Sequence, residues 1–345
     1  MDLQTVWFVA VAVLWTGFLL LEGFDFGVAA LIPVLGRRTA DRHLMLRTVG
    51  PLWDGNEVWL VTAVGATFGA FPIWYGSWLP ALYLPFVGVL VGLIVRAVGF
   101  EWRHSSHDER WDRTWTRIIT GGSLVACLGL GAALGATTLG LPIGADGVRV
   151  GGAFSGLHWP ALLGAVAVLA FALVHGALFL ALKTDGPLRL RARAFALRWS
   201  PVAALPLLLW AGLVQLRQGT TLTGFLWVVA ALAVVLTWSQ AKLDREGRAF
   251  AGWALTLVAS MATVFGAAYP VVLPSTIDAA FDLTVSSASV SDYTLTLMSW
   301  VAAVGLPVVI GYQAWTYWVF RTRLTAGPQQ EDAAAGTGSG AGTGS

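Results

Sequence analysis

The chain has 345 residues, of which 57% are hydrophobic and only 12% are charged, with a formal net charge of +2. Soluble domains carry about 25% charged residues, so the composition excludes a soluble globular protein and indicates a polytopic membrane protein. The single cysteine, Cys127, excludes an internal disulfide and any metal or iron–sulfur site that needs several cysteine ligands.

Apolar segments long enough to cross a bilayer recur along the chain. A transmembrane helix needs about 20 mostly apolar residues, and proline, glycine or charge marks the breaks between segments. The first segment lacks a basic N-terminal region and contains Glu22 and Asp25, so it is predicted to be a retained span and not a cleaved signal peptide. The fold class is therefore an all-α membrane protein with nine transmembrane helices, predicted at 5–33, 55–74, 78–100, 117–140, 159–181, 199–216, 222–240, 250–270 and 294–319.

The short segment Phe71–Trp78 is predicted to join the second and third spans. Residues 1–325 are expected to form one transmembrane helical domain. Residues 326–345 are expected to form a flexible tail, because they end in a run of only glycine, alanine, serine and threonine. The sequence leaves open whether this tail is native or engineered.

Basic residues are distributed very unevenly over the predicted loops. All of the 21 lysines and arginines except Arg96, Arg149 and Arg217 fall in alternate loops or in the C-terminal segment, on one side of the membrane. Such a bias marks the cytoplasmic side. The N-terminus is thus predicted outside and the C-terminus in the cytoplasm, which requires an odd number of spans.

Two carboxylates lie in the cytoplasmic half of the first span. Glu22 and Asp25 are three residues apart and therefore share a helix face. Two such groups in a low dielectric are not expected both to be ionised, so we expect them to share a proton and titrate together. Gly23 and Gly27 flank Asp25 and allow close approach of another helix. A role limited to hydrogen bonding between helices is the alternative.

A second acidic pair opens the second span. Asp54 and Glu57 have the spacing of an N-cap residue and an N3 carboxylate, which both favour the helix dipole. Glu57 is therefore interpreted as part of a helix cap. Asp54 fits either a cap or a proton path.

Arg96 is the only basic side chain inside a predicted span, at the depth of the acids. It either extends to water at the helix end or pairs with Glu22 or Asp25. Glu101, at the boundary of the same span, is either solvated or functional. His175 is the only histidine inside a span. Haem ligation by His175 is disfavoured because no second ligand is evident, and its role stays open. No metal site is predicted.

Five runs of residues resemble successive signatures of subunit II (CydB) of cytochrome bd-type quinol oxidases. They are Glu22–Gly27 (EGFDFG), Pro51–Leu60 (PLWDGNEVWL), Arg96–Arg103 (RAVGFEWR), Tyr269–Ser275 (YPVVLPS) and Ala314–Trp318 (AWTYW). The resemblance covers most of residues 1–325 and is weakest between about 185 and 250. The Trp-Asp-Gly-Asn run at 53–56 is its most specific part.

The resemblance implies a haem-free subunit of an oxidoreductase in the bacterial plasma membrane. Its partner, subunit I, would carry two haems b and haem d and oxidise quinol near the outer face. Oxygen would be reduced to water with protons taken from the cytoplasm, which builds a membrane potential without pumping. The sequence leaves open which quinone is used, how oxygen enters and whether a small accessory subunit is present.

The same resemblance implies roles for individual residues. Asp54 matches a position assigned to proton entry, and Glu101 matches an acidic position at the cytoplasmic mouth. Asp25, Trp53 and Arg96 match positions near a bound quinone that is structural. The predicted proton path consists of Asp54, Asp25, Glu22 and Glu101. Glu57 is not included, because family members can carry glutamine there.

Two other functions are consistent with buried acids and one arginine. A stand-alone proton-coupled secondary transporter would use them equally well, but such proteins often show inverted repeats and paired broken helices at mid-membrane, and neither is evident in the sequence. A purely structural assembly subunit is the third hypothesis, and the clustering of acids argues against it.

Overall fold

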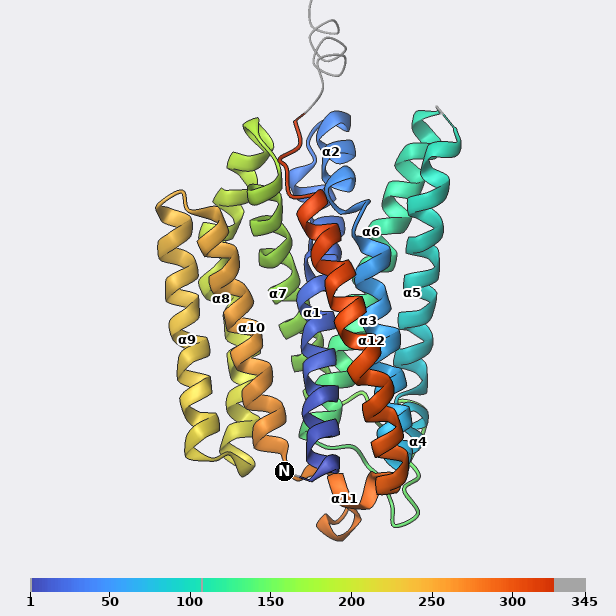
Figure 1. Cartoon of the computed structure of the whole chain (residues 1–345). Helices are drawn as coiled ribbons and strands as arrows, with labels where there is room; N and C mark the ends of the chain where they lie inside the picture. The colour runs from blue at the N-terminus through green and yellow to red at the C-terminus, as the bar shows by residue number, and fades with distance from the viewer. Residues whose placement is uncertain (1, 107, 326–345) are drawn as a thin grey trace, which may run out of the picture.

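The computed structural model describes residues 2–106 and 108–325 and consists almost entirely of helices (Figure 1). The predicted tail, 326–345, lies outside the described residues. The helices are α1 (Leu3–Leu35), α2 (Thr39–Val49), α3 (Trp53–Ala70), α4 (Pro72–Ala81), α5 (Tyr83–Trp102), η1 (Arg103–Ser105), α6 (Glu109–Leu139), α7 (Trp159–Lys183), α8 (Gly186–Gln218), α9 (Thr221–Lys242), α10 (Glu246–Ala268), η2 (Ala279–Phe281), α11 (Val285–Ala288) and α12 (Asp292–Val319).

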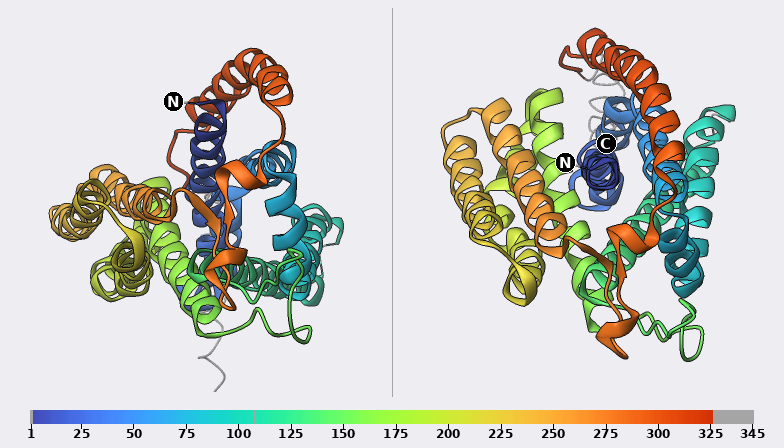
Figure 2. Two further views of the ribbon diagram at one scale, coloured as in Figure 1. Left: turned by 90° about the horizontal axis from the view of Figure 1, so that it is seen from below. Right: turned by 60° about the horizontal axis from the view of Figure 1, so that its bottom comes forward.

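Helix α1 lies at the centre of the bundle, with α8, α9 and α10 on one side and α5 and α6 on the other (Figure 2). Its packing against α7 depends on glycine. A Cβ atom on Gly27 would lie 1.8 Å from the carbonyl oxygen of Ala172, and one on Gly176 would lie 2.4 Å from the Val28 nitrogen. The predicted close approach of another helix at Gly27 is thus confirmed, and backbone contact of this kind is typical of helix association in lipid.

The second predicted span, 55–74, is divided in the structure. Helix α3 ends at Ala70, and α4 starts at Pro72 after a break at Phe71, whose φ and ψ are −133° and 64°. Proline suits the first helical position because its missing N–H would have no partner there. The prediction that Phe71–Trp78 is a plain connecting segment is therefore wrong, because α4 occupies most of it.

Eight helices of the described chain are long and apolar enough to cross a membrane: α1, α5 together with η1, α6, α7, α8, α9, α10 and α12. Helix α3, which opens with Trp-Asp-Gly-Asn-Glu, is not among them. Two predicted spans, 117–140 and 199–216, start well after the helices in which they lie, because α6 begins at Glu109 and α8 at Gly186. The arginines assigned to loops there extend these helices, and arginine is a good helix former.

The helix ends that carry the predicted basic loops all lie at one end of the bundle, the upper end in Figure 1. We call this the basic end; it includes α2, η1 and the turn between α9 and α10. Ion pairs connect its helices: Arg189 on α8 lies 2.6 Å from Glu246 on α10, and Arg191 lies 2.7 Å from Asp41 on α2. Lys183 donates to the carbonyl oxygens of Phe320 and Thr322 and so fixes the segment after α12.

The opposite end carries the loop between α10 and α12. Strands β1 (Val271–Leu273) and β2 (Leu283–Thr284) pair there antiparallel, with Val271 opposite Thr284. The first described residues lie at this end, whereas the last described residues lie at the basic end (Figure 1).

Candidate functional site

The two carboxylates of α1 lie close to α3 and α5, at the end of the bundle that carries α2. Glu22 forms an ion pair with Arg96 of α5, and both side chains are completely buried. Of the two possibilities that the sequence leaves open for Arg96, the structure shows pairing with an acid of the first span, and Glu22 is the partner. A buried pair of this kind holds both helices in one register, because removal of either charge leaves the other without compensation.

Asp25 binds a different helix. Its Oδ2 accepts a hydrogen bond of 2.7 Å from Nδ2 of Asn56 on α3. The Oδ1 atom of Asn56 accepts two further hydrogen bonds from α12, one from Nε2 of Gln313 (2.9 Å) and one from the hydroxyl of Tyr317 (2.8 Å). Asn56 therefore connects the carboxylate of Asp25 on α1 to α12.

Aromatic rings surround the guanidinium of Arg96. Its Cζ lies 4.9 Å from the ring centroid of Phe26 and 5.5 Å from that of Phe100. Phe100 in turn stacks on Trp53, with ring centroids 5.2 Å apart and an interplanar angle of 12°. Cation–π contacts at desolvated positions contribute about 2 kcal/mol, so the rings stabilise the charge while they exclude water.

Asp54 and Glu57 are less buried than the acids of α1. Asp54 is exposed and Glu57 is half-buried. The predicted N-cap role is wrong: α3 begins at Trp53, its N-cap residue is Leu52, and no side chain caps the helix. The reason is that the backbone turns into the helix before Asp54, since the Leu52 carbonyl already accepts from the Asn56 nitrogen. Asp54 still lies in the first turn, where a carboxylate favours the helix dipole.

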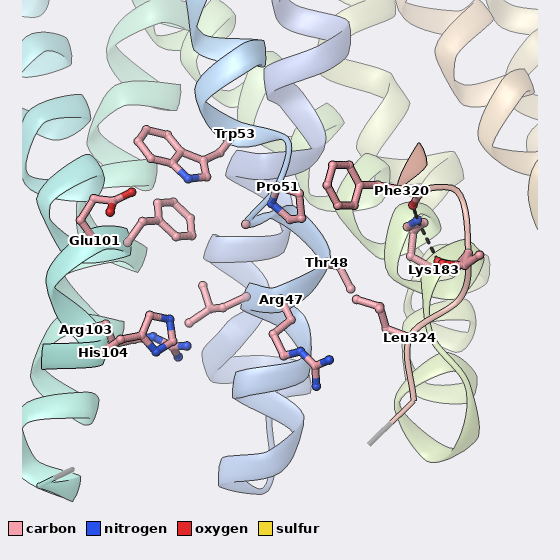
Figure 3. Close-up of a pocket in the computed structure, with 14 residues that line it drawn as sticks. Arg47, Thr48, Pro51, Trp53, Glu101, Arg103, His104, Lys183, Phe320 and Leu324 are labelled. Atoms are coloured by element: carbon pink, nitrogen blue, oxygen red, sulfur yellow. Dashed lines mark hydrogen bonds between the residues drawn. The ribbon is translucent and has the colours of Figure 1, made fainter. Parts of the chain in front are cut away.

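A cavity of about 560 Å³ opens beside this group at the basic end (Figure 3). Trp53 and Glu101 lie on one side of the cavity, and Lys183 and Phe320 lie on the other. The predicted quinone residues are thus separated: Trp53 lines the cavity, whereas Asp25 and Arg96 are completely buried behind it and do not line it. Glu101 is exposed.

His175 lies on the other side of α1. Its Nε2 atom is 3.0 Å from the carbonyl oxygen of Leu20, and its ring stacks on Phe250 with centroids 4.5 Å apart. The side chain is fully buried. These contacts define a packed histidine between α7, α1 and α10.

Several polar atoms of the cluster have no hydrogen-bond partner among the described residues. They include Oε2 of Glu22, Oδ1 of Asp25, and Nε and Nη2 of Arg96. Buried polar groups in native proteins are nearly always satisfied by protein or water. These atoms can therefore bind further polar groups at membrane depth.

Sequence reasoning missed three members of the cluster: Asn56, Gln313 and Tyr317. Asn56 lies between Asp54 and Glu57 in the Trp-Asp-Gly-Asn run, but it carries no charge and so lacks the signal that marks its two acidic neighbours. Gln313 had a usable signal, because a polar side chain inside an apolar span commonly hydrogen-bonds to another helix. No group of three or more metal-ligating side chains occurs within the described ranges.

The geometry defines a helical membrane protein with a buried charge cluster near one membrane face. Residues 3–320 match the sequence family of cytochrome bd terminal oxidase subunit II. The chain is 37% identical to the cytochrome bd ubiquinol oxidase subunit 2 of Bacillus subtilis, over 94% of this chain and 97% of that protein. It is 34% identical to the cytochrome bd-I ubiquinol oxidase subunit 2 of Escherichia coli K12, with coverage of 94% and 95%.

A solved structure described as bd oxidase from Geobacillus thermodenitrificans matches with a TM-score of 0.77 at 18% identity and covers 93% of this chain and 99% of that chain. At this identity, the match supports the fold alone. The sequence matches decide membership: the chain belongs to the cytochrome bd terminal oxidase subunit II family. It is a multi-pass bacterial membrane protein and a component of an oxidoreductase, and the stand-alone transporter hypothesis is not favoured.

Proposed function

We propose that this chain is the haem-free subunit of a quinol:oxygen oxidoreductase that delivers cytoplasmic protons toward a haem-bearing subunit I. Its relatives in B. subtilis and E. coli are named ubiquinol oxidase subunits, which supports quinol as the electron donor. Two haems b and haem d belong to the partner in this proposal. The observation that carries it is the completely buried set of Glu22, Asp25 and Arg96 near the basic end.

The proposed proton path starts at the exposed carboxylates. Asp54 and Glu101 are accessible at the basic end, and Asp25 and Glu22 lie deeper on α1. Asn56, two residues after Asp54, hydrogen-bonds to Asp25 and so brings the start of α3 next to the buried acids. Chains of carboxylates at membrane depth are a common means of proton relay. The unpartnered oxygens of Glu22 and Asp25 are the atoms that receive and release protons in this scheme.

We further propose that the cavity beside Trp53 holds a quinone in a structural role. The flat Trp53–Phe100 stack offers a surface for a planar ring. Arg96 and Asp25 act there from behind the ring stack: Arg96 contacts Phe100, which lines the cavity. Loss of bound quinone in Arg96→Ala, measured by extraction from the purified complex, supports this role. Unchanged quinone content and unchanged assembly contradict it.

We also propose nine membrane crossings, with the N-terminus outside and the C-terminus in the cytoplasm. Helix α3 alone is too polar to qualify as a membrane span. In this proposal, α3 and α4 together form the ninth crossing. The first and the last described residues lie at opposite ends of the bundle, which supports an odd number of crossings (Figure 1). The basic side chains gathered at one end support the orientation.

Replacement of Asp54 by asparagine tests the proton path. The complex purified through this chain should keep its haem b and haem d absorption bands, because Asp54 is exposed and supports no buried contact. Quinol-driven oxygen consumption should fall about 10-fold, within the range expected for loss of a proton-transfer group. Full turnover removes Asp54 from the path, and absence of haem bands in the wild-type complex contradicts the assignment of the partner.

A further inference from the structure

A second cavity, of about 460 Å³, lies at the basic end between α2, η1 and the start of α6. Six of its lining side chains are arginine or histidine: Arg42, His43, Arg47, Arg103, His104 and Arg113. This cavity is separate from the acids of the proposed proton path. Its volume lies within the range of about 300–1,000 Å³ that is typical of small-molecule sites.

The positive charges in this cavity are only partly compensated. Two acids line it, Glu109 and Asp112, against four arginines. Asp112 is engaged by Nε2 of His43 at 3.1 Å and by Nη1 of Arg103 at 3.5 Å. Glu109 lies 3.9 Å from Arg113, a loose contact in which both side chains are more than half exposed. The cavity therefore carries an excess of positive charge.

Two arginines have donors available for a ligand. Arg47 forms no ion pair with any other residue that the structure describes. The Arg103 side chain is only 5% exposed, and its Nη1 atom, although 3.5 Å from Asp112, forms no hydrogen bond within the described part of the chain. A buried guanidinium is costly unless its N–H groups are satisfied. An anion between α2 and η1 would satisfy both.

The two cavities are neighbours. Arg47, Arg103 and His104 line both, and Figure 3 shows Arg47 extending from α2 below the apolar wall formed by Trp53 and Pro51. The basic cavity therefore adjoins one that has both apolar rings and charged side chains in its lining. Basic pockets between helices on the cytoplasmic side are typical binding sites for anionic lipid headgroups.

We propose that the cavity between α2, η1 and α6 binds a phosphate group, with Arg47, Arg103 and Arg113 as donors. Guanidinium groups bind phosphate oxygens through paired N–H donors. The phosphate belongs either to the headgroup of an anionic membrane lipid or to a free phosphate from the cytoplasm. The chemistry of recognition is the same in both cases.

Binding to the delipidated, purified complex distinguishes the two sources. Native mass spectrometry compares phosphatidylglycerol with phosphatidylcholine of the same acyl chains, and equilibrium dialysis measures radiolabelled inorganic phosphate. The variant is Arg47→Gln combined with Arg113→Gln. Its matched control is Arg37→Gln combined with Arg110→Gln, two exposed arginines on the adjoining segments that do not line the cavity. Haem absorption checks assembly in every sample.

We expect preferential binding of phosphatidylglycerol or binding of inorganic phosphate. The binding that is observed should be weaker by about 10-fold or more in the Arg47/Arg113 variant, since each arginine near an anionic group contributes on the order of a fivefold factor. The control variant should bind as the wild-type complex does. A preference for phosphatidylglycerol identifies a lipid headgroup, and phosphate binding without that preference identifies a free anion. The proposal is wrong if phosphatidylglycerol binds no better than phosphatidylcholine and inorganic phosphate does not bind. It is also wrong if the control variant loses as much binding as the Arg47/Arg113 variant.

Discussion

Charged residues occupy two different environments at the basic end, and they obey different energetics. Glu22 and Arg96 are completely buried and pair across α1 and α5. Arg113 and Glu109 pair one helical turn apart on α6, with side chains 53% and 86% exposed. The first pair sits among aromatic rings, whereas the second is surrounded by solvent.

The difference shows which charges determine the structure. In low dielectric, desolvation makes an unpaired charge very costly, so a buried pair must stay together. At the surface, water and salt screen the attraction, and a pair contributes about 0–1 kcal/mol. The buried cluster therefore fixes helix positions, while the exposed groups are free to exchange protons with the cytoplasm.

The largest effect is expected for Arg96→Ala. This change leaves the Glu22 carboxylate buried without a partner and should lower the free energy of unfolding by about 3–5 kcal/mol. The midpoint of thermal unfolding of the purified complex, followed by tryptophan fluorescence, measures it. Arg113→Ala is the matched control and should change stability by less than about 1 kcal/mol. Equal effects of the two changes would contradict the comparison.

A smaller effect is expected for Asn56→Ala. The change removes the amide that joins Asp25 to Gln313 and Tyr317 and leaves buried polar atoms unpaired, which costs about 1–3 kcal/mol. Tyr317→Phe removes only one hydrogen bond of the set and should cost about 1 kcal/mol. The same unfolding measurement ranks the two. If Tyr317→Phe destabilises more than Asn56→Ala, Asn56 is not the central connection.

The smallest structural effect is expected for Glu101→Gln. Glu101 is exposed at the cavity mouth, so the unfolding midpoint should not move measurably. Oxygen consumption should fall only a few-fold, because Asp54 remains as a second entry group and an exposed carboxylate is readily replaced by water. The rate of quinol-driven oxygen consumption at several buffer concentrations measures this decrease. A loss as large as that of Asp54→Asn would make Glu101 the principal entry.

The sequence predicted the helical membrane fold and the gathering of basic residues at one end, and it offered pairing with an acid as one of two possibilities for Arg96, because each follows from the cost of charge in lipid. It did not predict the break at Phe71 or the helical starts of α6 and α8, because composition locates apolar segments and not helix ends. Asn56 and Gln313 were missed for a related reason: neutral polar side chains are tolerated in spans, and only the structure brings them to Asp25.

The cavity lining also could not be predicted from the sequence. Trp53 and Arg96 are neighbours through Phe100, yet only Trp53 reaches the cavity. Proximity along helices shows which side chains share a depth. It does not show which of them an aromatic ring covers.

The central claim is that the buried carboxylates carry protons to the oxygen-reducing partner, and Asp25→Asn tests it most directly. Asparagine keeps the shape of the side chain and can still accept the hydrogen bond from Asn56, but it cannot take up and release a proton. We predict that the purified complex retains its haem bands and unfolding midpoint, and that its oxygen consumption falls about 10-fold, with recovery in Asp25→Glu. Wild-type turnover in a fully assembled Asp25→Asn complex would contradict the account.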